Sequence, residues 1–469
     1  MKTRLLFGLL LPATVAVALF WWIREPADRP NILLITVDTL RANHLGLYGY
    51  ERPTSPNLDA FADTAVVFDN AFTQATLSGP AHGTMMTGLY PQVHGAIDNL
   101  VPLNEGNRTL AELLRSAGYE TAMFVSHRFV GPKYGFARGF DLAVVKSVRS
   151  HGPGHDHDGK GDAETNEIFE AVLEWLGQPK TTPFFAWLHV QHPHKSYDPP
   201  QPYDRMFVEP PDSSAHNLRC LYTLDDHRKG EVVLDEQERE FVVALYDGEI
   251  AFVDAELGRV FSELKRLGHD EKTIVVLTSD HGEMLFDDPW QRETGHWKHR
   301  FDPSLRIPLI VRAPGANQGG ERVSAMVGLI DLAPTLLELV GVKGPVGFQG
   351  ESLVRLLDGG ETTIRERSYS CTYHSDGVTR LSVRTLRRKL ICDKRRSEYD
   401  CLLFDLERDP DELRPVDGSD YDAEATELRA ALEAWHDENV DRGKLLTLPP
   451  RSKRALKLLR EAGYIEDDE

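Results

Sequence analysis

Short apolar runs that alternate with amphipathic helical patterns dominate the sequence after residue 30. Such runs are typical of strands that are buried on both faces of a parallel sheet. They lie at residues 31–38, 120–126, 183–190, 273–278 and 306–312, and helical patterns lie at residues 57–68, 110–117, 162–176, 238–267 and 331–340. The alternation predicts an α/β fold with a large mixed, mostly parallel sheet flanked by helices on both faces.

The pattern changes near residue 346 to short, charged strands and then to helical patterns. The strands lie at 367–372, 381–384, 389–392 and 402–406, and the helical patterns at 423–438 and 452–463. We therefore expect an N-terminal segment and linker at residues 1–30, a catalytic domain at 31–345 and a smaller C-terminal α+β subdomain at 346–469. The chain has Cys220, Cys371, Cys392 and Cys401, and we expect disulfide pairing among the last three.

The N-terminus resembles an export signal or a single membrane anchor. Lys2 and Arg4 precede an apolar stretch at residues 5–23 that ends at a Trp pair. About twenty apolar residues span a membrane, and positive charge before the span places the rest of the chain outside the cytoplasm. We expect an uncleaved anchor and a periplasmic or extracellular protein. The net charge of −20 argues against nucleic acid as a partner, because such partners need basic surfaces.

Acidic residues follow two of the predicted strands. Asp38 ends the first strand, and Asp280 and His281 follow the strand at 273–278. Because parallel strands end at one edge of a sheet, we expect these side chains to converge with Ser78, which lies on a tight loop. Two carboxylates and an imidazole suit one divalent cation. Oxygen ligands favour calcium, magnesium or manganese, and the imidazole is also compatible with manganese or zinc. Contact with the cation would activate the Ser78 oxygen as a nucleophile.

A further set of basic side chains follows the strands and the Ser78 loop. These groups could neutralise sulfate or phosphate oxygens and protonate a leaving oxygen. We interpret three of them as catalytic groups, His82, His127 and His194, and three as substrate-binding groups, His189, His296 and Lys298.

With these residues assembled, the chain resembles the sulfatase family of the alkaline-phosphatase superfamily. The segments that carry the resemblance lie at residues 31–41, 78–91, 246–250, 278–283 and 306–315. The resemblance implies a metal site at Asp38, Asp280 and His281, with calcium the commonest ion. It also implies that position 78 holds the nucleophile, which in active sulfatases is a formylglycine made from Cys or Ser by a maturation enzyme. The hydrate of that group attacks sulfur, and the product collapses to release sulfate.

The chain departs from the family pattern at three places. His82 stands where the maturation signature has Arg, and His82 lacks the permanently charged, two-pronged donor of that residue. Thr39 stands where many sulfatases have a second metal-binding Asp, as in the branch that includes phosphonate monoester hydrolases. The segment Ser126-His127-Arg128 lacks the Lys of a Lys-x-His pair.

Three functions follow from this pattern. The first is hydrolysis of small-molecule or glycan sulfate esters, with Ser78 acting as formylglycine or as plain serine. The second is hydrolysis of phosphodiesters or phosphonate monoesters at the same site. The third is an exported, catalytically impaired binding protein that keeps the metal. A two-zinc phosphatase is less favoured, because the strand end at residues 189–194 carries no Asp.

Overall fold

The computed structural model describes residues 29–443, apart from 147–159, 212–217, 219–223, 225, 228, 288–293, 297–299, 316–318, 361, 375 and 417–422. The proposed anchor at 5–23, Cys220, Lys298 and the helical pattern at 452–463 lie outside the described residues. Within the described part, no helix combines the length and the apolar character needed to cross a membrane.

A nine-stranded mixed sheet forms the centre of the molecule, in the order β11-β2-β10-β6-β1-β5-β3-β4, with β9 also paired to β2. Its strands are β1 (Asn31–Val37), β2 (Val66–Phe72), β3 (Glu120–Val125), β4 (Leu142–Val145), β5 (Phe184–Val190), β6 (Thr273–Thr278), β9 (Arg306–Ile307), β10 (Leu309–Arg312) and β11 (Glu321–Gly328). Strands β9 and β10 run against the others. The predicted large, mostly parallel sheet is therefore confirmed.

Two details of the sheet correct the sequence prediction. The predicted helix at 57–68 ends early, because α2 (Pro56–Ala62) gives way to β2. The run Val66, Val67 and Phe68 favours a strand, and pairing with β10 and β11 on its two sides stabilises it. The predicted strand at 306–312 is divided at Pro308 into β9 and β10. Proline has no N–H to continue a strand ladder.

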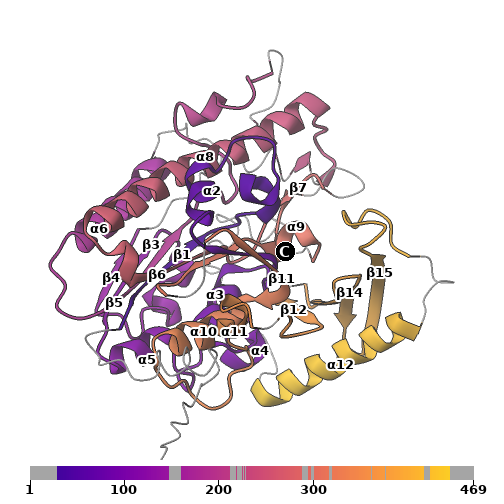
Figure 1. The fold of residues 1–469 in the computed structure, drawn as a ribbon. Helices are drawn as coiled ribbons and strands as arrows, with labels where there is room; N and C mark the ends of the chain where they lie inside the picture. The colour runs from indigo at the N-terminus through magenta and orange to yellow at the C-terminus, as the bar shows by residue number, and fades with distance from the viewer. Residues whose placement is uncertain are drawn as a thin grey trace, which may run out of the picture.

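Helices cover both faces of this sheet (Figure 1). On one face lie α2, α6 (Lys160–Leu176) and the long α8 (Glu236–Arg266), and on the other lie α3 (Ser78–Thr87), α5 (Leu110–Ser116), α10 (Leu332–Leu339) and α11 (Val354–Leu357). Alternate strand residues supply two separate apolar cores, one under each helical layer. Shorter elements are α4 (Pro91–His94), α9 (Asp302–Leu305), the β7–β8 pair (Met284–Leu285 and Thr294–Gly295) and 3-10 turns at Ala42–His44, Gly46–Tyr48, Arg128–Val130, Pro132–Tyr134, Tyr203–Arg205, Asp270–Lys272 and Leu329–Asp331.

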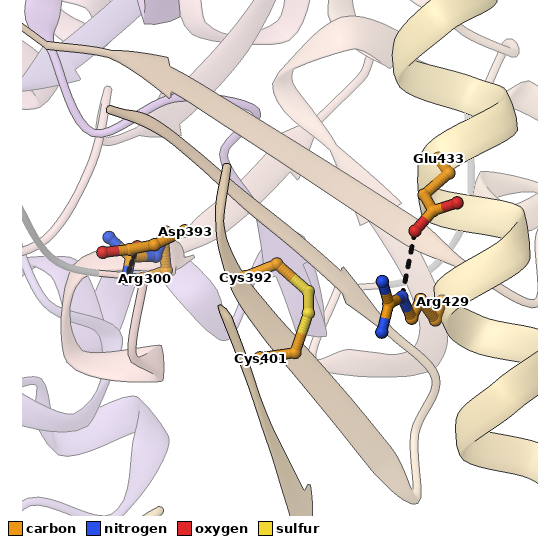
Figure 2. Close-up of a disulfide and its surroundings, with 6 residues drawn as sticks. All are labelled: Arg300, Cys392, Asp393, Cys401, Arg429 and Glu433. Atoms are coloured by element: carbon orange, nitrogen blue, oxygen red, sulfur yellow. Dashed lines mark hydrogen bonds and ion pairs between the residues drawn. A yellow bond between two sulfur atoms is a disulfide. The ribbon is translucent and has the colours of Figure 1, made fainter. Parts of the chain in front are cut away.

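A four-stranded antiparallel sheet follows the main sheet, as the charged strands predicted. It contains β12 (Ser368–Tyr373), β13 (Thr379–Arg384), β14 (Arg388–Arg395) and β15 (Glu398–Asp405), and α12 (Ala423–Gly443) lies across it (Figure 1). A disulfide joins Cys392 of β14 to Cys401 of β15 (Figure 2), which confirms pairing among the last three cysteines. Cys371 is a buried free thiol. The domain boundary near residue 346 stays a prediction.

Candidate active site

Strand alternation places four side chains of the candidate site on one face of the main sheet. His189 of β5 lies opposite Thr36 of β1 and Val125 of β3. Two residues further on, β1 is followed by Asp38 and β3 by His127. Because side chains of the same parity point to the same face, these residues share the face that is covered by α3. Asp280 follows β6 in the same way, since Thr278 pairs with Thr36.

The predicted metal ligands meet at this edge. Suitable ligand atoms of Asp38, Asp280 and His281 all lie within 4.8 Å of one another, and all three side chains are buried. Nε2 of His281 is 3.4 Å from Oδ2 of Asp280 and 4.0 Å from Oδ1 of Asp38. The backbone N–H groups of Thr39 and His281 donate to the other Asp280 oxygen, Oδ1, and hold this carboxylate in place.

The donor set fits a divalent cation. Both Asp38 oxygens, Oδ2 of Asp280 and Nε2 of His281 have no hydrogen-bond partner among the described residues. Nδ1 of His281 lies 3.1 Å from the Gly282 carbonyl oxygen and donates to it, so the lone pair of Nε2 faces the two carboxylates. Buried anionic oxygens without donors are costly, and a cation at their centre removes that cost.

The acidity of the carboxyl groups reflects this crowding. Burial raises the pKa of Asp38, and the nearby charges of Asp280 and Glu283 raise it further. Burial also opposes ionisation of Asp280, but the His281 and His82 side chains outweigh it and lower the pKa of Asp280 below its usual range. One carboxyl of the pair therefore ionises readily, while the other needs an added positive charge to ionise.

Ser78 begins helix α3, and the whole of this helix is buried. Nδ1 of His82, one turn later, donates to the Ser78 carbonyl oxygen at 2.8 Å and lies 3.7 Å from Oδ2 of Asp280. The first turn of α3 is thus held against the carboxylates. Asn99, which the sequence analysis missed, accepts a hydrogen bond from the Gly79 N–H at 2.7 Å. Its amide nitrogen Nδ2 is buried and has no partner among the described residues.

His189 is held from behind by Thr36, another residue that the sequence analysis missed. Oγ1 of Thr36 lies 2.9 Å from Nδ1 of His189 and 3.4 Å from Nε2 of His82. The indole N–H of Trp187 also donates to Oγ1 of Thr36, at 3.0 Å. Nε2 of His189 then faces Oδ2 of Asp38 at 3.7 Å. The position of Thr36, two residues before Asp38, is the sequence signal that indicates this contact.

The remaining histidines also lie close to the metal ligands. The His296 ring lies 4.1 Å from the His281 ring and 5.1 Å from the His194 ring, measured between centroids. Nδ1 of His296 is 3.2 Å from Oε1 of Glu283, a buried carboxylate that the sequence analysis did not assign to the site. His127 lies 6.2 Å from His194. The structure therefore brings together the described carboxylates and histidines of the predicted site, and it places Ser78 at the start of the neighbouring helix α3.

The loop that carries Asp38 is held by helix α8. The hydroxyl of Tyr246 donates to the Thr39 carbonyl oxygen at 2.8 Å and accepts from the Arg41 N–H at 3.0 Å. Thr39 has a φ of 55°, a left-handed conformation that favours glycine. The two hydrogen bonds of Tyr246 hold this strained turn and thereby direct the Asp38 carboxylate towards Asp280.

Comparison with known proteins agrees with this geometry. The sulfatase family profile matches residues 30–342, and the profile of the N-sulphoglucosamine sulphohydrolase C-terminal region matches residues 293–438. The N-acetylglucosamine-6-O-sulfatase of Bacteroides thetaiotaomicron is 25% identical over 501 residues, which cover 89% of this chain and 88% of the relative. The multifunctional alkaline phosphatase superfamily protein PehA of Trinickia caryophylli is 29% identical over 405 residues, covering 71% of this chain and 78% of the relative.

Two solved structures have the same fold. One is the structure of a protein in complex with its substrate D-glucosamine-2-N,6-O-disulfate, with a TM-score of 0.73 at 23% identity. The match covers 88% of this chain and 98% of that protein's chain. The phosphonate monoester hydrolase of Agrobacterium radiobacter has a TM-score of 0.71 at 23% identity, with coverages of 88% and 96%. The profile match over most of the main sheet shows that this chain belongs to the sulfatase family of sulfuric ester hydrolases.

Proposed function

We propose that this chain hydrolyses small-molecule or glycan sulfate esters at Ser78, beside one divalent cation held by Asp38, Asp280 and His281. The observation that supports this proposal is the set of buried carboxylate and imidazole atoms that have no hydrogen-bond partner in the described part of the chain and face the start of α3. When bound, the cation lowers the pKa of the attacking hydroxyl and offsets charge on the ester oxygens. Calcium is the first candidate, and manganese and magnesium are the alternatives.

The protein side chains have separate tasks in this reaction. His82 fixes the first turn of α3 and so directs Ser78 towards sulfur. The amide nitrogen of Asn99, which has no partner among the residues that the structure describes, is a candidate donor to an ester oxygen. The imidazole of His194 is the candidate for protonating the leaving alcohol oxygen. If residue 78 is plain serine, water then displaces sulfate from it and gives its proton to the imidazole. If residue 78 is formylglycine, its second hydroxyl gives its proton to the imidazole, and the hemiacetal ester collapses to the aldehyde and sulfate.

The chemical form of residue 78 has a direct test. Conversion of Ser78 to formylglycine removes two hydrogens, about 2 Da, and gives an aldehyde hydrate as the nucleophile. The intact mass of the peptide that contains Ser78 separates this form from plain serine. A peptide at the unmodified mass from an active preparation would assign the reaction to the serine hydroxyl and exclude a maturation enzyme as partner.

The role of Ser78 is tested with Ser78→Ala and the control Ser324→Ala, whose serine is exposed on β11. We expect Ser78→Ala to lose at least about a thousandfold in kcat for aryl and glycan sulfates, because the covalent route is removed. Ser324→Ala should retain full activity. Full turnover by Ser78→Ala would refute nucleophilic catalysis at this residue. A folded, metal-loaded wild type without turnover would favour the binding-protein alternative.

A second candidate activity is hydrolysis of phosphonate monoesters or phosphodiesters. His281 faces the carboxylates with Nε2, and Thr39 replaces a carboxylate, the pattern of the phosphonate monoester hydrolase branch. Parallel assays with matched aryl sulfate, phosphodiester and phosphonate esters decide between the two activities. A higher kcat/KM for the phosphorus esters would make sulfate hydrolysis the side activity.

The location of the protein is also part of the proposal. Export to the periplasmic or extracellular face, with residues 5–23 as a membrane anchor, follows from their charge and apolar length. Fractionation of cells that produce the full chain, compared with a chain that starts at residue 29, tests it. Recovery of the full chain in the soluble fraction would exclude the anchor.

A further inference from the structure

We propose that Asp38, His127 and His189 hold a second divalent cation, so that the Asp38 carboxylate bridges two metal ions. The second site is separate from the set Asp38, Asp280 and His281 and shares only the bridging carboxylate. The inference extends the proposed function, but the site itself rests on geometry. A two-zinc phosphatase is less favoured from the sequence because the segment 189–194 carries no Asp, but the second site takes its carboxylate from Asp38, outside that segment.

The two oxygens of Asp38 face opposite imidazoles. Oδ1 is 4.0 Å from Nε2 of His281, whereas Oδ2 is 3.7 Å from Nε2 of His189. Ligand atoms of Asp38, His127 and His189 all lie within 4.8 Å of one another. These three side chains are at most 3% exposed, and neither Asp38 oxygen nor Nε2 of His189 has a hydrogen-bond partner among the described residues. Each oxygen of one carboxylate thus has its own imidazole partner for a cation.

The hydrogen bonds behind His189 determine which of its nitrogens carries a lone pair. Nδ1 of His82 donates to the Ser78 carbonyl oxygen, so Nε2 of a neutral His82 must accept. The single proton of the Thr36 hydroxyl satisfies that nitrogen, and Oγ1 accepts from Trp187. If Nδ1 of His189 also donates to Oγ1 of Thr36, then the Thr36 hydroxyl, the Trp187 N–H, Nε2 of His82 and Nδ1 of His189 all have hydrogen-bond partners. Nε2 of His189 is then a bare lone pair that faces an anionic oxygen, an arrangement that a cation stabilises.

The charge of the site supports the same conclusion. Asp38, Asp280 and Glu283 bring three buried negative charges, and Lys195 offsets one of them at Glu283. One divalent cation balances the two negative charges that remain on these carboxylates. A second cation makes the net charge of the site positive, which favours binding of an anionic ester. His82 stands where the family resemblance implies an Arg, and the segment Ser126-His127-Arg128 lacks the Lys that the resemblance implies. A second cation would supply the positive charge that these two replacements remove.

The chemistry of the donors indicates which ions are suitable. Two imidazoles and one carboxylate are ligands typical of zinc or manganese rather than of calcium. A pair of cations bridged by a carboxylate could contact both the attacking and the leaving oxygen of one ester. We therefore expect a dinuclear centre with a calcium-like or manganese site at Asp280 and a zinc or manganese site at His189.

The test compares the wild-type full chain with His189→Gln, His127→Gln and the control His436→Gln. His436 is a buried imidazole on α12, outside the candidate site. Each protein is stripped with a chelator, reloaded with Mn²⁺ or Zn²⁺ and freed of unbound ion by gel filtration. Metal per chain is measured by mass spectrometry, and the Mn²⁺-loaded proteins are examined by electron paramagnetic resonance. Circular dichroism and thermal unfolding confirm that each variant folds.

We expect the wild type and His436→Gln to bind one more metal per chain than His189→Gln and His127→Gln. Ions bound elsewhere add equally to all four proteins and cancel in this difference. The wild-type Mn²⁺ spectrum should show an exchange-coupled pair, and either site variant should show isolated Mn²⁺ only. Equal metal contents in the four proteins, or an uncoupled wild-type spectrum, would overturn the second site. A one-metal protein that hydrolyses sulfate esters would refute this inference alone, and a coupled pair without ester turnover would refute the proposed function alone.

Discussion

At the scale of single residues, a few uncharged groups determine how the charged groups of the site are oriented. Thr36 contacts His189, His82 and Trp187 through one hydroxyl. Asn99 holds the first turn of α3 through the Gly79 N–H. Neither side chain ionises at neutral pH, and a search for charged or titratable residues therefore does not find them. Their importance depends on what they contact.

Replacement of Thr36 by Val removes the hydroxyl and keeps the shape of the side chain. The buried N–H groups of Trp187 and His189 then lose their acceptor, so we expect the free energy of unfolding to fall by about 1–3 kcal/mol. Metal affinity or kcat/KM should fall about 10- to 100-fold, as when other supporting residues of metal sites are changed. Thr165→Val is the matched control, because its buried Oγ1 has no partner among the described residues and its loss should be neutral or stabilising. Similar losses in both variants would refute the role of Thr36.

Asn99→Ala tests the Asn99 side chain, whose amide nitrogen is buried close to the start of α3. We expect kcat to fall about 100-fold, since a hydrogen-bond donor to the ester oxygens would be lost. Asn70→Ala is the control, because Asn70 bonds the Ser324 carbonyl oxygen at an exposed position. Steady-state kinetics on an aryl sulfate measure both. An unchanged kcat in Asn99→Ala would show that the amide only supports the helix.

At the scale of elements, the site depends on how closely the loop after β6 packs against α9. The N–H groups of Gly282 and Glu283 donate to the carbonyl oxygens of Ser304 and Pro303. A Cβ atom on Gly282 would lie 2.0 Å from the Pro303 oxygen, which is backbone and cannot rotate away. Glycine at this position lets the two segments approach and so places Asp280 and His281 beside Asp38.

Gly282→Ala should therefore displace the metal ligands. We expect the free energy of unfolding to fall by about 1–3 kcal/mol from overpacking and the bound metal to be lost at micromolar ion concentrations. Gly177→Ala is the control, because the atoms nearest its added Cβ lie at ordinary contact distance, 3.5 Å. Metal titration and urea unfolding measure both effects. A Gly282→Ala protein with wild-type metal affinity would contradict the packing argument.

At the scale of the whole molecule, the C-terminal sheet supports both sides of the site. The N–H of Cys371 in β12 donates to the Gln74 carbonyl oxygen, shortly before Ser78. Lys389 of β14 contacts Asp302 at 2.7 Å and Glu412 at 2.6 Å, and it is fully buried. Arg300 and Asp393 form another ion pair between the two parts, at 2.7 Å (Figure 2). The small sheet is thus connected to the nucleophile segment and to the segment after the metal loop.

Glu412 makes this junction sensitive to pH. Burial raises the pKa of Glu412 from 4.5 to about 7, although Lys389 opposes the shift. The folded state then binds the proton more tightly than the unfolded chain, so the contribution of Glu412 to stability is complete below pH 4.5 and is lost as the pH rises through 7. We expect Glu412→Gln to remove about 1–3 kcal/mol of this pH dependence. Urea unfolding of both proteins at several pH values measures it, and parallel curves would contradict the prediction.

Much of the architecture follows from local sequence. The buried strands β1, β3, β5 and β6 are apolar runs whose ends are marked by polar residues, and their parallel arrangement brings Asp38, Asp280 and His281 to one edge. The sequence prediction failed at β2, because the predicted helical stripe extends to residue 68, although the β-branched run at its end favours a strand that pairing with β10 and β11 stabilises. The anchor at 5–23 and the role of Lys298 stay predictions.

The sequence by itself determined the layered α/β sheet and the ligand types at its edge, because apolar periodicity indicates which strands and helix faces are buried, and parallel strands end at one edge. Only the tertiary structure decided which side chains and backbone groups contact these metal ligands and the histidines beside them. It turned His82 inward to the Ser78 carbonyl oxygen, placed Thr36 behind His189 and gave the two oxygens of Asp38 different imidazole neighbours. Such contacts join residues far apart in the chain, and their geometry depends on register and packing, which local sequence does not specify.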